Sequence, residues 1–283
     1  MPEWNPFPHS ADEYQYTGEK LQQAWPELHR GDVATFCDSD WAAACIDQAP
    51  GCVNVEFDGD ISGLAERMQD AWRHYHSGDF GQAVALADSC GLIGHSAANK
   101  ASGIYATYLE PDEQIQRAIF IRAIERAEAA VETLPFDANS HYFLAFNLGR
   151  YSQSISVVKA LRQGVGSRIQ SALTTALARE PDHAEAHTAF GMYHAEIIDK
   201  VGKMIGSMTY GASADLAIEH FERALDLTPR SPIAHIEYGN GLYLLYGDRQ
   251  LDKVSELYEK AVELDALDAM EKLDIEAALE EME

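Results

Sequence analysis

Residues 21–32 read LQQAWPELHRGD, and this pattern returns 47 residues later as MQDAWRHYHSGD at residues 68–79. A second recurrence, an alanine with a proline five residues later, occupies 130–135, 176–181 and 224–229 at spacings of 46 and 48 residues. A fixed period of this length is typical of stacked supersecondary units, each of which buries its apolar face against its neighbours. The repeat therefore predicts the architecture before any single segment is interpreted.

Helical periodicity runs through nearly the whole sequence, and no long stretch alternates as a β-strand does. The glycine and proline breaks predict helices at 11–25, 41–46, 62–77, 80–89, 95–109, 112–133, 139–163, 167–179, 183–206, 213–227, 232–246, 250–264 and 266 to the end. The predicted fold class is all-α, a right-handed superhelix of stacked helical hairpins with units of about 47 residues. We expect an N-terminal segment with a degenerate helical repeat at 1–60, the repeat array at 61–265, and an acidic capping helix at 266–283.

Composition limits the classes of partner. The 283 residues carry a formal net charge of -25. Such a surface repels polyanions, which excludes nucleic acid and anionic membranes as general partners of the whole surface. The sequence begins without the basic and apolar regions of a signal peptide and has no apolar run near 18 residues, which predicts a cytoplasmic protein without a membrane span.

The second helices of the units follow a known packing pattern. Small residues lie where two helices cross, a large apolar residue lies between them, and a proline ends the helix. The sequence resembles the tetratricopeptide pattern most fully at Ala217, Phe221, Ala224 and Pro229. The usual unit of that pattern has about 34 residues. The excess here lies between the first and second helices, at 152–166 and 197–212, and predicts long first helices or ordered loops.

The two longest units carry a closer resemblance. LGRYSQ at 148–153, GMY at 191–193 and DKVGKM at 199–204 are similar to the tetratricopeptide domain of the regulator-of-microtubule-dynamics family. The resemblance covers about residues 138–229. It implies the fold, an adaptor-like role and phospholipid binding in the groove, and it supplies no catalytic residue.

The charge is locally inverted in the same region. Between Asp137 and Glu180 the sequence has no acidic residue, and it has Arg150, Lys159 and Arg162 among its basic ones. One interpretation is a basic face that binds an acidic peptide, a phosphate-bearing ligand or the acidic C-terminal segment. The other is a solvated hairpin whose charges are scattered. We take Lys159 and Arg162, which share a helix face, as candidate binding residues, together with Lys200 and Lys203 in the next unit.

The first helices of a tetratricopeptide array line its concave wall. Placing each first helix by its glycine predicts a set of aromatic, methionine and polar residues on that wall. These are Phe143, Phe146, Arg150, Gln153, Met192, Glu196, Asn240 and Tyr243. The mixture suits an extended peptide or a lipid-like ligand. The alternative is that the long first helices close the groove and bury these side chains.

Sites for chemistry are weak in comparison. A zinc site would have to combine Cys37, Cys45, Cys52 and His29, whose spacings lack the close cysteine pair of structural zinc sites. His183 and His187 share a helix face, but Glu185 stands one position away from the place that zinc proteases require. We therefore predict no metal, no cofactor and no catalytic residue.

The sequence thus predicts a non-enzymatic adaptor that binds a protein or peptide partner in its groove. The alternative is a carrier that holds a lipid or another apolar small ligand between the long helices, near Met192, Met204 and Met208. The extended apolar segment 4–8 either docks back on the body or captures another protomer, so a homo-oligomer is a further alternative.

Overall fold

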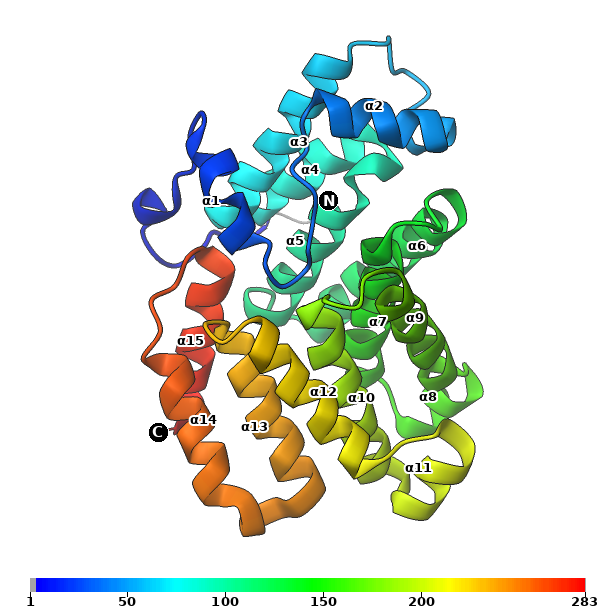
Figure 1. The fold of residues 1–283 in the computed structure, drawn as a ribbon, viewed down its shortest axis with the longest axis vertical. Coiled ribbons are helices and arrows are strands. Elements are labelled where there is room, and N and C mark those ends of the chain that lie inside the picture. Colours follow the sequence, from blue (N-terminus) through cyan, green and yellow to red (C-terminus); the bar gives the residue numbers. More distant parts are fainter. Residues whose placement is uncertain (1–3, 283) are drawn as a thin grey trace. The chain divides into compact units, whose positions relative to one another are not determined.

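The computed structural model describes residues 4–282, so the first three residues of the segment 1–60 and the last residue of the segment 266–283 lie outside the description. The described residues form helices and connecting turns without a β-strand, which confirms the all-α prediction (Figure 1). By contacts the chain divides into two compact units. Among the described residues, one unit contains 4–29, 34–154 and 268–270, and the other contains 30–33, 155–267 and 271–282. The sequence does not predict a division near Ser154, and the three-part division at residues 60 and 265 stays a prediction.

The first unit is a series of antiparallel helices, each packed against the next. The helices α3, α4, α5, α6 and α7 make successive contacts, and α7 also packs against α5. The elements of this unit are η1 (Asp12–Tyr14), α1 (Lys20–Leu28), α2 (Ser39–Gln48), η2 (Pro50–Cys52), α3 (Ile61–His76), α4 (Phe80–Cys90), η3 (Leu92–Gly94), α5 (His95–Tyr108), α6 (Glu113–Thr133) and α7 (Ala138–Gln153).

The N-terminal segment docks on this unit. The ring of Trp4 lies 4.1 Å from that of Tyr105, whose hydroxyl accepts a hydrogen bond from the backbone of Asn5 at 3.1 Å. Of the two alternatives for this segment, docking is therefore the one found. The helix predicted at 11–25 is wrong in its first half, because Gly18 adopts a left-handed conformation (φ 56°) and α1 begins only at Lys20.

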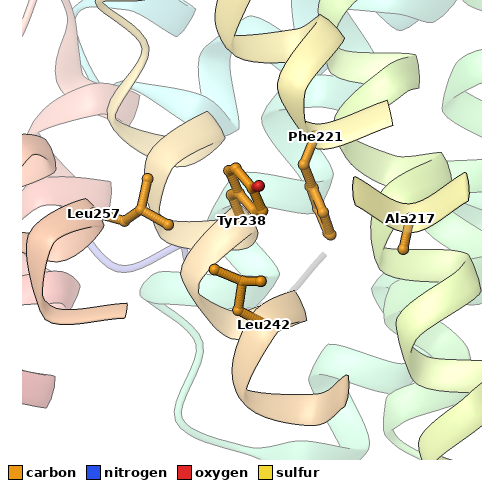
Figure 2. Close-up of a cluster of buried hydrophobic side chains, with 5 residues drawn as sticks. All are labelled: Ala217, Phe221, Tyr238, Leu242 and Leu257. Carbon is orange, nitrogen blue, oxygen red and sulfur yellow. The ribbon is translucent and has the colours of Figure 1, made fainter. Parts of the chain in front are cut away.

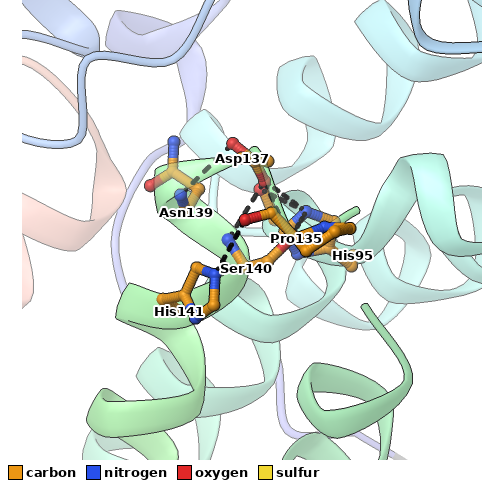
Figure 3. Close-up of polar contacts among 7 residues, drawn as sticks. His95, Pro135, Asp137, Asn139, Ser140 and His141 are labelled. Carbon is orange, nitrogen blue, oxygen red and sulfur yellow. Dashed lines mark hydrogen bonds and ion pairs between the residues drawn. The ribbon is translucent and has the colours of Figure 1, made fainter. Parts of the chain in front are cut away.

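A polar network joins the connection between α6 and α7, and the first turn of α7, to the start of α5 (Figure 3). Asp137 caps α7 by accepting hydrogen bonds from the backbone of Asn139 and Ser140, and its carboxylate also lies 2.8 Å from Nε2 of His95. Burial would raise the pKa of Asp137, but the hydrogen bonds and the charge of His95 outweigh it, so this pKa is lowered. The network fixes the sharp connection between the two helices.

The second unit also stacks helices in order. Contacts join α9 to α10, α10 to α12 and α13, and α13 to α14, and these helices lie side by side in Figure 1. The elements are α8 (Val157–Arg162), α9 (Val165–Arg179), α10 (Ala184–Val201), α11 (Lys203–Tyr210), α12 (Ala214–Leu227), α13 (Pro232–Tyr246), η4 (Gly247–Gln250), α14 (Leu251–Val262) and α15 (Ala269–Met282), whose first two residues belong to the first unit.

The extra residues of the two long units form separate short helices. The helix predicted at 139–163 is broken before Ser156, which caps α8 by accepting from the backbone of Lys159. The helix predicted at 183–206 ends at Gly202, which has a φ of 81°. A residue with a side chain rarely adopts that conformation. The inserts are therefore ordered helices, α8 and α11, and the first helices are shorter than predicted.

The core of the second unit is built around Phe221 on α12. Figure 2 shows its ring among Ala217, Tyr238, Leu242 and Leu257. The ring stacks on that of Tyr238 with a centroid distance of 5.1 Å. The close approach of three helices depends on glycine, because a Cβ at Gly191 of α10 would lie 2.7 Å from the Phe221 ring. The alanine and aromatic positions of the repeat pattern thus do the packing that the sequence predicted.

The acidic C-terminal helix covers the last hairpin. Ala278 of α15 joins a buried cluster with Ile236 of α13 and with Tyr258 and Ala261 of α14. Tyr258 also donates a hydrogen bond from its hydroxyl to Glu281. This packing is what a capping helix of a repeat array provides.

Candidate interaction surfaces

The predicted groove residues of the first unit lie on α7, and they differ in exposure. Phe143 is only 1% exposed, so the expectation that it lines an open wall needs correction: α7 packs against both α5 and α6, which buries it. Phe146 is half-buried and carries the guanidinium of Arg150 at 5.7 Å from its ring centroid. Gln153 is exposed at the end of the helix.

The predicted groove residues of the second unit lie on two neighbouring first helices, α10 and α13, which pack against each other. Met192 is half-buried against the Phe221 cluster. The amide of Asn240 lies 2.6 Å from the hydroxyl oxygen of Tyr258, which donates its proton to Glu281. Tyr243 is 52% exposed, although its helix buries Leu242. Glu196 forms an ion pair with Lys200 at 2.7 Å. The first helices of this unit therefore present a mixed polar and apolar surface.

The two inserted helices expose apolar side chains. We call this region the insert surface and define it by the exposed apolar residues Val157, Val158, Leu161, Met204, Ile205 and Met208. Both inserts adjoin the first turns of α9. The helix α8 leads into α9 through Gly164, and Gln170 of α9 donates a hydrogen bond to the carbonyl of Tyr210 at the end of α11.

The predicted basic candidates lie on the same two inserts. Lys159 and Arg162 are exposed on α8, and Lys203 is exposed at the start of α11. Lys200 is exposed on the last turn of α10, two residues before Gly202. All four basic residues thus lie beside the exposed apolar residues that define the insert surface. The sequence-based prediction of the site did not include those apolar residues. The run VVKAL and the i, i+4 methionine pair at 204 and 208 are the sequence signals that indicate it.

An open pocket of about 690 Å³ lies in the first unit, between the residues before α1 and the helix α3. Its lining includes Glu19, Asp38, Glu66 and Asp70. Arg73 is the basic residue of the lining, and it donates hydrogen bonds to the carbonyls of Tyr16 and Gly18 and to the carboxylate of Asp70. Because these bonds hold the N-terminal segment in place, we assign Arg73 a structural role.

The histidines that raised the metal hypothesis have structural partners. His183 caps α10 by accepting from the backbone of Ala186 at 3.1 Å. Nδ1 of His187 lies 2.8 Å from Nδ1 of His220, and His194 and His220 stack on the ring of Phe190. Burial lowers the pKa of His194 and of His220 to about 4. Among residues 4–282, no three metal-binding side chains converge.

The thiols lie in surroundings that disfavour the thiolate. Cys37, Cys52 and Cys90 are buried, and Cys45 is half-buried. Burial raises the pKa of Cys37 and of Cys45 to about 12. A thiol that stays protonated is a poor nucleophile and a poor metal ligand, so the geometry assigns these residues to packing.

The fold and its motifs define this chain as a tetratricopeptide-like helical-repeat protein. A model of the family described as regulator of microtubule dynamics protein 1-3 matches residues 97–272, which is more than half of the chain. The chain therefore belongs to that family. The matched residues extend on both sides beyond the resemblance predicted at 138–229. Members of this fold and family are generally non-catalytic. No curated protein matches the chain.

The chain is similar to several solved structures at low identity. TTC0263, a tetratricopeptide protein of Thermus thermophilus, is 16% identical, covers 76% of this chain and 98% of its own, and has a TM-score of 0.54. MamA of MSR-1 is 14% identical over 70% of this chain and 98% of its own, with a TM-score of 0.40. A monomeric mutant of IFIT1 is 15% identical over 89% of this chain and 67% of its own, with a TM-score of 0.32. The likeness to TTC0263 supports the fold class.

The length and hydropathy of the helices can be compared with those of a membrane-spanning helix. None of those in the described part of the chain is long and apolar enough to cross a bilayer.

Proposed function

We propose that this chain is a non-enzymatic, cytoplasmic adaptor that binds a protein partner through the first helices of its second unit. The observation that carries the proposal is a set of four partly exposed residues, which we call the first-helix row: Met192 and Glu196 on α10, and Asn240 and Tyr243 on α13. These residues lie on two helices in contact and are half-buried or exposed. A surface of this mixed character suits the binding of a peptide segment, since aromatic and methionine side chains supply contact area and the polar groups fix orientation.

The carrier alternative gains no support from Met204 and Met208, two of the three methionines that suggested it. Met204 is 74% exposed and Met208 is 83% exposed, so both lie on the outside of the second unit and not between its helices. A homo-oligomer remains an alternative, because the partner that occupies the first-helix row is itself a proposal. A partner that turns out to be a second copy would be recognised by the mass of the complex.

The test is quantitative affinity purification from the native host with two matched variants. Tyr243→Ser removes an aromatic side chain that is 52% exposed on the first helix α13, and Leu251→Ser removes an apolar one that is 44% exposed on the second helix α14. We expect Tyr243→Ser to reduce recovery of the bound partner about tenfold, as loss of an interface tyrosine does, and Leu251→Ser to leave it unchanged. Equal recovery by the two variants would refute the placement of the site.

A further inference from the structure

The helix α11 presents its apolar side to solvent. Gly206 is buried, and a Cβ at this position would lie 3.3 Å from Ile197 of α10 and 3.6 Å from Ala212. The opposite side of the helix carries Met204 and Met208 at i and i+4, which are 74% and 83% exposed. A surface helix normally buries its apolar stripe. Here a glycine faces the body and the large apolar residues face outward.

The helix α8 repeats this arrangement. None of its residues is buried, and Val157, Val158 and Leu161 are all exposed. Lys159 and Arg162 flank these apolar residues on the same short helix. Two separate inserts, each adjoining the start of α9, therefore present branched apolar or methionine side chains beside basic ones. An isolated exposed apolar residue needs no explanation, but six on two short inserts that both contact α9 are typical of an interaction surface.

The charge around the insert surface differs from that of the rest of the chain. Residues 155–168 contain Lys159, Arg162 and Arg168 and no acidic residue. In the second insert, Lys200 is neutralised by Glu196, at 2.7 Å, and the charge of Lys203 is balanced in number by that of the exposed Asp199, so the excess of cations lies on the first insert. In a chain whose formal net charge is -25, this local excess of cations favours an anionic partner.

The acidic C-terminal segment of the chain is not that partner. Leu273 and Ile275 of α15 are buried, and Glu281 accepts a hydrogen bond from Tyr258. An anionic bilayer fits poorly as well. A bilayer presents its negative surface to much of the acidic molecule, whereas a short segment meets only the insert surface. Charges farther away than about 8 Å are largely screened at physiological salt.

We propose that the insert surface binds an acidic amphipathic helix of a partner protein. The inference rests on the proposed adaptor function only in assigning the chain a protein partner, and it adds a second binding surface, on α8 and α11, to the one proposed on α10 and α13. Apolar residues at i, i+3, i+4 and i+7 of the segment pack on Met204, Met208 and Leu161, and methionine adapts to such side chains because it is flexible. Glutamate and aspartate on the flanks of the segment face Lys159 and Arg162.

The test is a selection from a display library of random peptides of about 16 residues, long enough for four helical turns. Peptides are selected on the wild-type protein and counter-selected on the double variant Met204→Asp, Met208→Asp. We expect the enriched peptides to combine glutamate or aspartate with apolar residues at helical spacing. A peptide chosen from them should bind the wild-type protein at least about tenfold more tightly than the counter-selection variant, as measured by fluorescence anisotropy.

Matched variants separate the contribution of the apolar side chains to peptide binding from that of the basic side chains. Val55→Asp introduces a charge at a 99% exposed position in the first unit and should leave binding unchanged. Reversal of the two basic charges by Lys159→Glu and Arg162→Glu should weaken binding, whereas reversal at the exposed Arg122 and Arg230 should not. Helical circular dichroism of every variant verifies that it is folded.

Three outcomes would overturn the proposal: enrichment of peptides without acidic residues, equal binding to the Met204→Asp, Met208→Asp variant, or binding of phosphatidylserine vesicles in place of any peptide. The adaptor function itself fails separately, through the Tyr243→Ser purification. If that purification supports a partner and the selection fails, only the insert surface is wrong. If the reverse holds, the first-helix row is wrong.

Discussion

At the scale of single residues, the pair His187 and His220 has a defined protonation pattern. Nε2 of His187 lies 3.0 Å from the carbonyl oxygen of Pro181, which only accepts, so Nε2 carries the proton. Nδ1 of His187 is then an acceptor and takes the hydrogen bond from Nδ1 of His220 at 2.8 Å. A second proton on His187 would place two N–H groups against each other. Protonation of His187 therefore breaks the hydrogen bond to His220.

This pair predicts a loss of stability in acid. Burial first, and the neighbouring groups second, lower the pKa of His187 and bring that of His220 to about 4. An unfolded histidine has a pKa of about 6.5. For His220 the stabilisation is complete above pH 6.5 and is lost as the pH falls toward 4, by up to about 1.4 kcal/mol per pH unit, and the lowered pKa of His187 acts in the same direction. Urea unfolding measured from pH 7.5 to pH 5 would show it.

The control for this prediction is His220→Asn, which keeps an N–H donor near the position of Nδ1 but cannot take up a proton. We expect a shallower pH dependence in this variant. A residual slope is expected from His194 and His235, because burial lowers the pKa of both. An identical slope in the variant and the wild type would show that the pair does not titrate as described.

At the scale of helices, close packing around Phe221 predicts opposite effects for one substitution at two glycines. In Gly191→Ala the new Cβ would lie 2.7 Å from the Phe221 ring, whereas at Gly149 of α7 a Cβ would meet nothing within 4 Å. Overpacking a core lowers the free energy of unfolding by about 1–3 kcal/mol. Replacing a helical glycine with alanine raises it by up to about 1 kcal/mol, because alanine has the higher helix propensity. We expect Gly191→Ala to destabilise the protein and Gly149→Ala to stabilise it, as measured by urea denaturation. Stabilisation in both variants would contradict the tight contact.

The helices also show how far the sequence predicts this structure. Alanine, aromatic and proline positions such as Ala217, Phe221 and Pro229 predict packing correctly, because helix crossings restrict residue size. The breaks at Ser156 and Gly202 were missed, since both lie in stretches with continuing helical periodicity. Phe143 was misplaced for another reason: its exposure depends on two neighbouring helices, α5 and α6, and not on its own helix alone. The outward face of α11 was missed because apolar residues are normally assigned to the core.

At the scale of the whole molecule, the net charge of -25 predicts a dependence of stability on salt. Like charges repel most strongly in the compact state, and the screening length falls from about 30 Å at 0.01 M salt to about 8 Å at 0.15 M. We expect the thermal unfolding midpoint to rise by a few degrees over this range, equally in sodium and potassium chloride. A midpoint that falls with added salt would show that ion pairs such as Arg126 with Asp88 outweigh the repulsion.

The inserted helices α8 and α11 have a consequence for the history of such a protein. Their exposed residues stand outside the packed cluster around Phe221, so substitutions at positions such as Val158 or Met208 change little of what holds the repeats together. A lineage is then free to exchange one binding preference for another by drift in two short segments, while the alanine and glycine positions of the repeats stay under selection for folding. Proteins that descend from one such scaffold would differ in sequence most in these two inserted helices, where substitutions reduce folding stability least.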